Sequence, residues 1–350
     1  MRIIRIVIKS LVLFFICNIL FAIIQPNYPL LSIYNHIIPG RERLPYGENP
    51  QLSYSITSNN LSTLFESHVV SRPKADDEYR VFLIGDSGTW GWFLEADQTL
   101  AAQINQGEHI TPDGKRIMAY NLGYPIMSIT KDLLILDYAR RYDPDLIIWL
   151  VTLESFPPSK QTFPPIVANN PEWMADLITR YDLPMESPTQ PDFIDLTIIG
   201  QRQELANWLR LQTYGFSWAA TGIDQYIPEN ISTQPFDFAD DLTWEGFTAD
   251  APFTAADLAF QQLHGVDIPM IIVNEPMYIS DDAQHYNIFY PRWAYDHYRE
   301  LMSNAGWGNY VDLWDAIPPE YFTDSPVHLN SEGTQLFSDR LVTIVMGFLD

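Results

Sequence analysis

The feature that most constrains the fold of this chain is a fully apolar run, residues 81–84, that ends in the glycine-rich turn Gly85-Asp86-Ser87-Gly88. A continuous apolar run bounded by charge and glycine is typical of a buried parallel strand. The pattern therefore predicts an α/β fold in which Ser87 lies just beyond the end of a buried strand, ahead of a helix.

Predicted strands and helices alternate along much of the chain. We expect strands at residues 80–84, 116–120, 146–151, 270–273 and 310–313, and helices at residues 99–106, 129–142, 201–214, 255–263, 292–304 and 332–348. Strands that alternate with helices imply a doubly wound, flavodoxin-like parallel sheet, here of about five strands flanked by helices. Ligands of such sheets bind beyond the carboxyl ends of the strands.

The first 24 residues form a separate element. Three basic residues, the last of them Lys9, precede a 15-residue apolar run, residues 10–24, that is broken only by Asn18. With Lys9 snorkelling, this is just long enough to span a bilayer of roughly 30 Å. The basic residues predict a cytoplasmic N-terminus and a main domain outside the cytoplasm. A cleaved signal peptide and a buried soluble helix are the alternatives, although no Ala-x-Ala precedes a cleavage point.

The remaining chain divides by composition. Residues 25–74 are rich in Pro, Asn and Ser and are predicted to form a stalk and lead-in segment, and residues 75–350 to form the α/β domain. Within that domain, residues 156–250 break the α/β rhythm and are rich in aromatic side chains. We expect them to be an insertion that acts as a lid, and its aromatics either stack on a sugar or form the core of the lid.

Composition limits the classes of function. The net charge of −24 over 350 residues argues against a nucleic-acid partner, because binding phosphate needs a cationic surface. Cys17 is the only cysteine, so no intramolecular disulfide is possible. The seven histidines show no metal-ligand spacing, and we expect neither a metal nor a cofactor.

A second motif, Asp324-Ser325-Pro326-Val327-His328, lies near the C-terminus. It supplies a carboxylate and an imidazole, which with Ser87 make the nucleophile, base and orienting group of serine acyl transfer. Three residues separate Asp324 from His328. The alternatives are a capping serine in an ordinary turn and a structural histidine. A phosphate-binding loop is a further alternative, although the lysine of a P-loop is missing.

These motifs resemble the SGNH (GDSL) hydrolase superfamily over roughly residues 78–154 and 265–350. Its serine block, Gly-Asp-Ser-x-Thr-x-Gly, matches residues 85–91, and its C-terminal Asp and His match Asp324 and His328. The resemblance implies that Ser87 is the nucleophile, His328 the general base and Asp324 the group that orients it. Many family members space the last two as Asp-x-x-His, so the extra residue here implies a bulged loop between Asp324 and His328. Asn121-Leu122-Gly123 looks like the second block, which implies an oxyanion hole built from the backbone N–H groups of Ser87 and Gly123.

The third family block, Gly-x-Asn-Asp after a strand, is replaced here by Val151-Thr152-Leu153-Glu154. The asparagine that would give a further oxyanion donor is absent. The Thr152 hydroxyl is the candidate replacement, and Asn121 or Asn274 are others. Glu154 stands at the position of the family aspartate, where it either stabilises the loop or contacts substrate. Asn274 ends the fourth strand and therefore also faces the expected site.

The resemblance implies a membrane-anchored serine esterase or O-acyltransferase that acts outside the cytoplasm on acylated carbohydrate or another envelope ester. By analogy with anchored members of the superfamily, a membrane-bound acyltransferase is a candidate partner. The missing asparagine and the Asp/His spacing keep a second hypothesis open. It is a non-catalytic envelope protein, used for binding or assembly, that retains a degenerate form of the domain.

Overall fold

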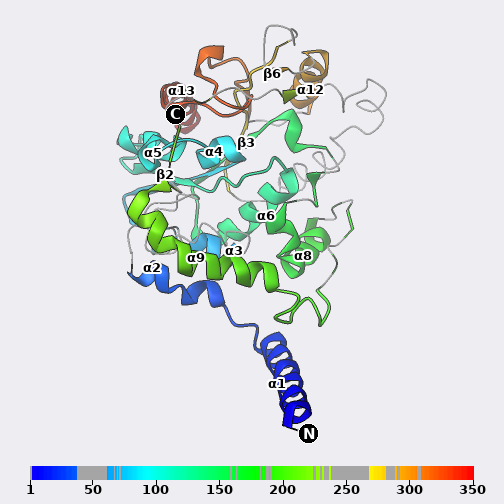
Figure 1. Cartoon of the computed structure of the whole chain (residues 1–350). Helices are drawn as coiled ribbons and strands as arrows, with labels where there is room; N and C mark the ends of the chain where they lie inside the picture. The colour runs from blue at the N-terminus through cyan, green and yellow to red at the C-terminus, as the bar shows by residue number, and fades with distance from the viewer. Residues whose placement is uncertain are drawn as a thin grey trace.

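The computed structural model of the 350-residue chain is drawn in Figure 1. The structure describes residues 2–37, 61–66, 68, 70, 72–157, 160–162, 164–181, 183, 185–186, 189, 191–223, 226–228, 231, 236–237, 268–280, 288–289, 292–305 and 309–350.

Five parallel strands form the central sheet. They are β1 (Glu78–Ile84), β2 (Arg116–Asn121), β3 (Leu146–Val151), β5 (Met270–Asn274) and β7 (Tyr310–Asp312). Their order across the sheet is β2-β1-β3-β5-β7, with every neighbouring pair parallel. This is the order of a flavodoxin-like doubly wound sheet, and it confirms the predicted fold class. The winding reverses between β1 and β3, so the loops that follow these two strands open side by side.

Helices cover both faces of the sheet. One core holds α3 (Leu61–Glu66), α6 (Ile129–Ala139), α7 (Pro165–Ala168), α8 (Pro171–Tyr181) and α12 (Arg292–Asn304), and the other holds α5 (Leu100–Gln106) and α13 (Ser331–Leu349). Strand β3 is buried on both faces. Its residues Ile147 and Trp149 enter the first core, while Ile148 and Leu150 enter the second. This explains why the strand reads as a continuous apolar run.

Local capping sets where the helices begin. The side chains of Thr99, Ser128 and Asn330 accept hydrogen bonds from the first turns of α5, α6 and α13. The helix expected at residues 129–142 ends at Ala139 and continues as the 3₁₀ helix η5 (Arg140–Tyr142). The expected helix at residues 255–263 lies outside the described residues.

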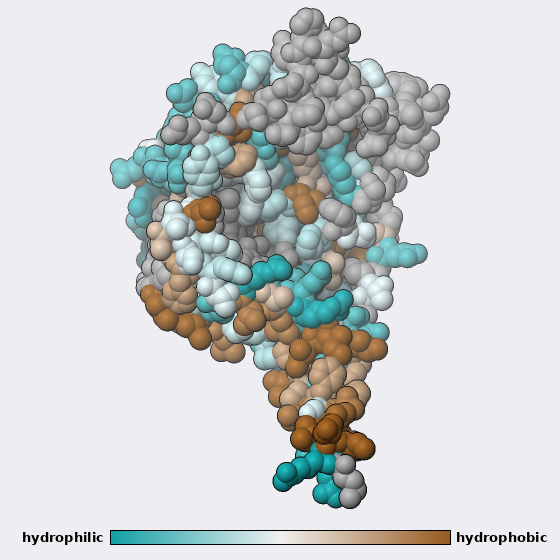
Figure 2. Space-filling model, in the orientation of Figure 1, coloured by the Kyte–Doolittle hydropathy of each residue, from teal (hydrophilic) through white to brown (hydrophobic). Residues whose placement is uncertain are grey.

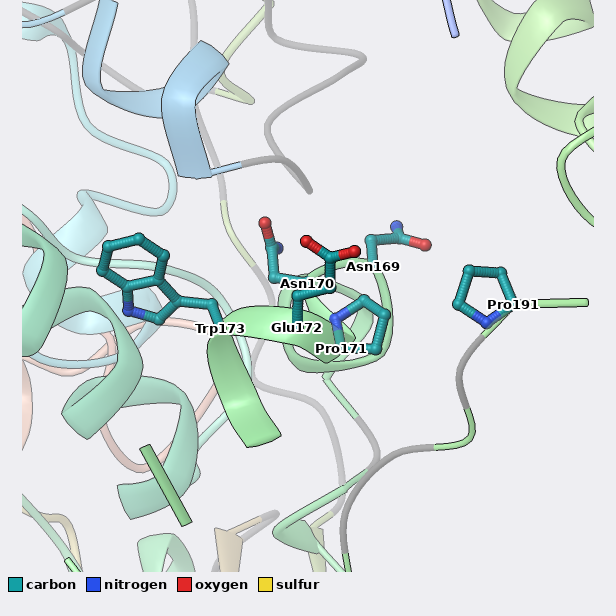
Figure 3. Close-up of a pocket in the computed structure, with 6 residues that line it drawn as sticks. All are labelled: Asn169, Asn170, Pro171, Glu172, Trp173 and Pro191. Carbon is teal, nitrogen blue, oxygen red and sulfur yellow. The ribbon is translucent and has the colours of Figure 1, made fainter. Parts of the chain in front are cut away.

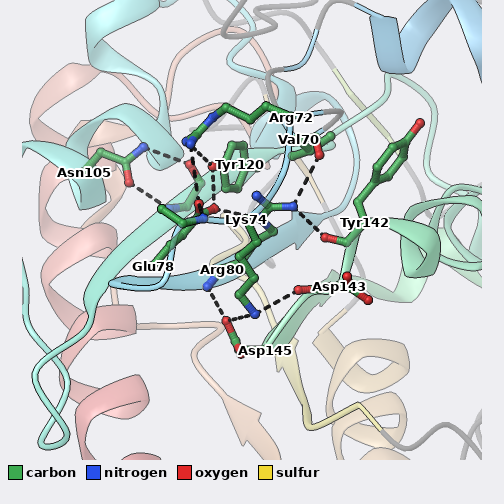
Figure 4. Close-up of polar contacts among 12 residues, drawn as sticks. Val70, Arg72, Lys74, Glu78, Arg80, Asn105, Tyr120, Tyr142, Asp143 and Asp145 are labelled. Carbon is green, nitrogen blue, oxygen red and sulfur yellow. Dashed lines mark hydrogen bonds and ion pairs between the residues drawn. The ribbon is translucent and has the colours of Figure 1, made fainter.

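A buried polar network ties the amino-terminal end of β1 to its neighbours (Figure 4). Arg80 Nε donates to Glu78 Oε1 over 2.7 Å, and its Nη1 donates to the backbone oxygen of Tyr142 over 2.6 Å. The Tyr120 hydroxyl also donates to Glu78 Oε1, over 2.7 Å. Burial alone would raise the pKa of Glu78, but these hydrogen bonds lower it to about 2. The network therefore holds a charged pair at the sheet end opposite to Ser87.

The base of the domain is built from the N-terminal segment and α9 (Arg202–Thr221). Helix α1 (Arg2–Ile24) projects away from the domain in Figure 1, and η1 (Tyr28–Leu31) and α2 (Ile33–Ile37) follow it. The backbone N–H of Tyr34 donates to the Gln212 side chain over 3.0 Å, and Gly215 lies against the Tyr34 ring. By length and composition, α1 could cross a membrane, as an anchor or a signal sequence would.

Short elements complete the description. They are α4 (Ser87–Trp90), η4 (Ala96–Gln98), η6 (Leu153–Ser155), η9 (Pro319–Tyr321) and a two-stranded sheet of β4 (Phe236–Asp237) and β6 (Ile288–Phe289). Within the expected insertion, α7 and α8 contribute to the core on the α6 side of the sheet, whereas α9 lies against α2 at the base. The division of the chain into anchor, lead-in, domain and lid remains a prediction.

Candidate active site

Ser87 stands where the sequence pattern placed it, as the first residue of α4 beyond the end of β1. Asp86 is the N-cap of this short helix, and its Oδ1 accepts a 2.7 Å hydrogen bond from the Gly88 backbone N–H. Gly85 makes the turn possible because a Cβ at that position would lie 2.2 Å from the Thr89 hydroxyl oxygen. The Ser87 side chain is left partly exposed at the carboxyl edge of the sheet.

The two ends of the loop that carries the candidate base, His328, are joined by backbone contacts. Phe322 and Leu329 form an antiparallel bridge, and the Thr323 backbone N–H donates to the His328 backbone oxygen over 2.9 Å. The loop between them accommodates the three residues that separate Asp324 from His328. The loop brings the carboxylate and the imidazole side by side.

Ser87, His328 and Asp324 form a continuous chain of hydrogen bonds. His328 Nε2 lies 2.8 Å from Ser87 Oγ, and its Nδ1 lies 2.8 Å from Asp324 Oδ1. Burial alone would raise the pKa of Asp324, but the hydrogen bond and charge of His328 lower it below its usual value. The carboxyl is thus held as a carboxylate that accepts a hydrogen bond from Nδ1–H, and this tautomer leaves Nε2 unprotonated and able to take a proton from the serine.

An aromatic wall, defined here as Trp90 and Trp92, flanks the imidazole. The Trp92 ring stacks on His328 with centroids 6.0 Å apart and planes inclined by 26°. Trp90 stacks in turn on Trp92 at 5.8 Å. Next to them, Phe93 has a φ of +61°, a left-handed conformation that bulky residues rarely adopt. Sequence reasoning missed this wall, although Trp90 lies within the serine block and Trp92 directly follows it.

Gly123, the second expected backbone donor of the oxyanion hole, packs against α4. A Cβ on Gly123 would stand 2.5 Å from the Trp90 backbone nitrogen, so Gly123 contacts the first turn of α4. Its own N–H donates to Asn121 Oδ1 over 3.1 Å. Ser87 is the first residue of α4, and the first N–H groups of a helix have no partner within that helix. The Ser87 N–H is therefore the candidate donor to a substrate oxygen.

Four side chains that the sequence analysis expected near the site are bound to other protein groups. Asn121 also donates to the Trp90 backbone oxygen, and the hydroxyl of the fully buried Thr152 contacts the Met127 sulfur at 3.7 Å. Glu154 pairs with Lys160. The amide of Asn274 bonds to two residues that flank its strand, and those partners are Asp312 at 2.8 Å and Tyr295 at 3.0 Å. All four therefore hold loops and strands together in this geometry.

A buried charge cluster that the sequence did not reveal lies beneath the serine turn. Lys131 is fully buried, pairs with Asp132 and donates to the Gly85 backbone oxygen over 2.7 Å. Glu275, next to Asn274, is buried close to the Asp86 carboxyl, because a Cβ on Gly88 would lie 3.3 Å from Asp86 Oδ1 and 3.8 Å from Glu275 Oε2. Burial first, and then the charge of Asp86, raise the pKa of Glu275 well above its usual value.

A surface cavity of about 280 Å³ lies away from these groups, at the start of α8 (Figure 3). It is lined by Asn169, Asn170, Pro171, Glu172, Trp173 and Pro191. The Trp173 indole N–H donates to Asp137 Oδ2 over 3.2 Å, and the Arg141 guanidinium lies over its ring. Because none of the three hydrogen-bonded side chains of the candidate site lines this cavity, we assign it no part in the chemistry.

Comparisons with known proteins leave the family open. No protein-family model matches the chain, and no curated protein matches it. Among solved structures, it is similar to a carbohydrate acetylesterase family member from Sinorhizobium meliloti, with 12% identity over 77% of this chain and 99% of that chain. The TM-score is 0.32. At this level the similarity supports no conclusion about activity, so the functional argument rests on the geometry of the site.

Proposed function

We propose that this chain is a serine-dependent acyl esterase or O-acyltransferase that works through an acyl-Ser87 intermediate. The observation that carries the proposal is the pair of 2.8 Å contacts that link Ser87 to His328 and His328 to Asp324. Their position at the carboxyl edge of the sheet, where ligands of this fold class bind, supports it.

The geometry supports a two-step reaction. In the first step, Ser87 Oγ attacks the ester carbonyl carbon while His328 Nε2 takes the hydroxyl proton. The negative oxygen of the tetrahedral intermediate would lie against the Ser87 N–H at the start of α4. Collapse of the intermediate breaks the ester bond, and the departing alcohol receives the proton from His328. In the second step, water or a sugar hydroxyl attacks the acyl-Ser87 carbonyl with the same base, and Ser87 regains its proton.

The aromatic wall supports an acylated carbohydrate as the substrate. Indole rings offer flat apolar faces, and one of them, Trp92, stacks directly against the base. A sugar ring that stacks beside Trp92 would carry its ester close to Ser87. Esters of other envelope molecules remain within the proposal, and a membrane-bound acyltransferase remains the proposed partner that would deliver an acyl group.

We also propose that α1 is retained as a membrane anchor, with the main domain outside the cytoplasm. Two contacts favour retention over cleavage. Asn18 in α1 accepts a hydrogen bond from the Ile199 backbone N–H, and Gln25 just after α1 donates to the Leu196 backbone oxygen over 2.9 Å. A cleaved signal peptide would have no reason to form specific hydrogen bonds with the mature domain.

The test compares the full-length chain with Ser87→Ala and His328→Ala. Ser303→Ala, on the exposed surface of α12, is the matched control. We expect hydrolysis of 4-nitrophenyl acetate and labelling by a fluorophosphonate in the parent and the control only. Equal hydrolysis by all four proteins, with no labelling of Ser87, would reject the serine mechanism.

Adding a sugar acceptor then separates the two activities. An O-acyltransferase forms acylated sugar at the expense of free acetate, whereas an esterase releases acetate at the same rate with or without the sugar. A non-catalytic role is the second candidate, because the Gly123 N–H is engaged by Asn121 and the third family donor is missing. Sugar binding without any turnover would favour it.

A further inference from the structure

Asn18, which interrupts the apolar run of α1, is held by the domain. It is only 5% exposed, and Ala22, one turn later, is 6% exposed, whereas Phe15 and Ile19 are open. Its Oδ1 accepts a 3.3 Å hydrogen bond from the Ile199 backbone N–H, and its Nδ2 donates to the Phe14 backbone oxygen over 2.9 Å. With the Gln25–Leu196 contact, this places residues 192–200 alongside the last two turns of α1.

The length of α1 fixes how deep this contact would lie in a bilayer. Arg5 and Lys9 must stay near the cytoplasmic surface, because burying a charge in lipid is costly. From Lys9 to Ile24 the helix rises only about 22 Å, while a hydrocarbon core is about 30 Å thick. All residues up to Ile24 are therefore needed to cross. Asn18 is six residues before Ile24 and lies about 9 Å below that end of the span.

Residues 192–200 carry both apolar and charged side chains. Phe193, Ile194 and Ile199 are 53%, 64% and 46% exposed, and the carboxylates of Asp192 and Asp195 are exposed as well. Because a charge in the hydrocarbon is costly, these carboxylates must lie among the lipid headgroups, at the level of Gln25, while Ile199 lies deeper, beside Asn18. Asp192 Oδ1 accepts hydrogen bonds from the backbone N–H groups of Ile194 and Asp195, which lowers the cost of bringing this irregular backbone to the lipid boundary.

The apolar surface continues from this segment across the base of the domain. Leu31, at the end of η1, is exposed, as are Ile33 and Ile37 of α2. Figure 2 shows hydrophobic residues gathered on the underside of the domain, continuous with those of α1. An exposed apolar surface of this kind marks an interaction site, and its continuity with the membrane helix identifies the bilayer as the occupant.

We propose that residues 192–200, together with η1 and α2, form a membrane foot that inserts into the outer leaflet beside α1. The domain is then seated on the lipid surface. The proposal rests on α1 being a retained span, and it is independent of the ester chemistry at Ser87.

The experiment uses the full-length chain in phosphatidylcholine–phosphatidylglycerol liposomes. Cys17→Ser removes the native thiol, and single cysteines are then placed at Ile194, at Val12 in the middle of α1, and at Leu336 on α13. Each is labelled with bimane. All three side chains are exposed, so the substitutions leave the core intact. Circular dichroism of each variant verifies the fold.

We expect bimane at Ile194 to match Val12, with blue-shifted emission, strong quenching by nitroxide lipids and little quenching by aqueous iodide. Bimane at Leu336 should show the opposite. If iodide fails to quench bimane at Val12 but quenches bimane at Ile194 as strongly as at Leu336, the membrane foot is refuted and α1 remains a membrane span. If iodide also quenches bimane at Val12, both the span and the membrane foot are refuted. Esterase assays on the same liposomes report separately on the chemistry.

Discussion

At the scale of single residues, the candidate chemistry depends on how Asp324 holds the imidazole. Replacing Asp324 with Asn would leave the shape intact but favour the wrong tautomer of His328. We expect kcat to fall by about 10⁴, as it does when the aspartate of other serine triads is changed. The measurement is steady-state ester hydrolysis. The matched control is Asp315→Asn on the exposed surface, and equal losses in both variants would contradict the assignment.

The lowered pKa of Asp324 makes a second residue-scale prediction. A carboxyl whose pKa is lower in the folded state stabilises the fold above its unfolded value of about 3.8, and this contribution is lost as the pH falls through the folded value. Urea denaturation of the parent and of Asp324→Asn should therefore show a difference in unfolding free energy that shrinks below pH 4. A constant difference at all pH values would count against the ion pair.

Glu275 should behave in the opposite way, because burial raises its pKa. An acid with a raised folded-state pKa contributes fully at pH values below 4.5, and stability falls as the pH rises from there toward the folded value. Glu275→Gln mimics the protonated form. We expect this variant to lack that part of the decline between pH 4.5 and 8, as measured by urea denaturation. A parallel pH profile in the two proteins would show that Glu275 carries no extra proton.

At the scale of elements, the close contact between Gly123 and α4 sets the position of the nucleophile. A Cβ at Gly123 would meet the Thr89–Trp90 backbone at under 3 Å, so Gly123→Ala must push α4 away. A displacement of about 1 Å can cost about 10²-fold in rate, and we expect a loss of that order in kcat. Gly347→Ala in α13, where the new Cβ meets nothing within 4 Å, should keep full activity.

The sequence predicted elements better than contacts between them. Apolar runs and glycine turns located all five strands of the main sheet, because burial and turn geometry are local properties. The serine block and the Asp324/His328 motif were also visible. The proximity of Glu275 to Asp86 was not, because nothing in either segment specifies a neighbour about 190 residues away. Asn18 was noticed as a break in an apolar run, but its partner Ile199 depends on tertiary structure.

At the scale of the whole molecule, the proposed topology can be read by labelling intact cells. In a Cys17→Ser background, a cysteine at Arg340, exposed on α13, should react with a membrane-impermeant maleimide. A cysteine at Ile3, near the start of α1, should react only after the cells are opened. Labelling of Ile3→Cys alone in intact cells would reverse the orientation, and labelling of neither would place the domain in the cytoplasm.

Asn18 accepts a hydrogen bond from the Ile199 N–H and Gln25 donates one to the Leu196 oxygen, and together these contacts limit how far the domain can move relative to α1. A domain joined to its membrane helix by a flexible linker can reorient above the bilayer. A domain that is held both by contacts with the helix and by its own base cannot. In Figure 1, α4 lies in the half of the domain away from α1. The serine would then stand at a single height above the lipid. Only the units of a long polymer that come to this distance from the membrane would reach Ser87. The positions of the modified units along the polymer would therefore depend on that distance.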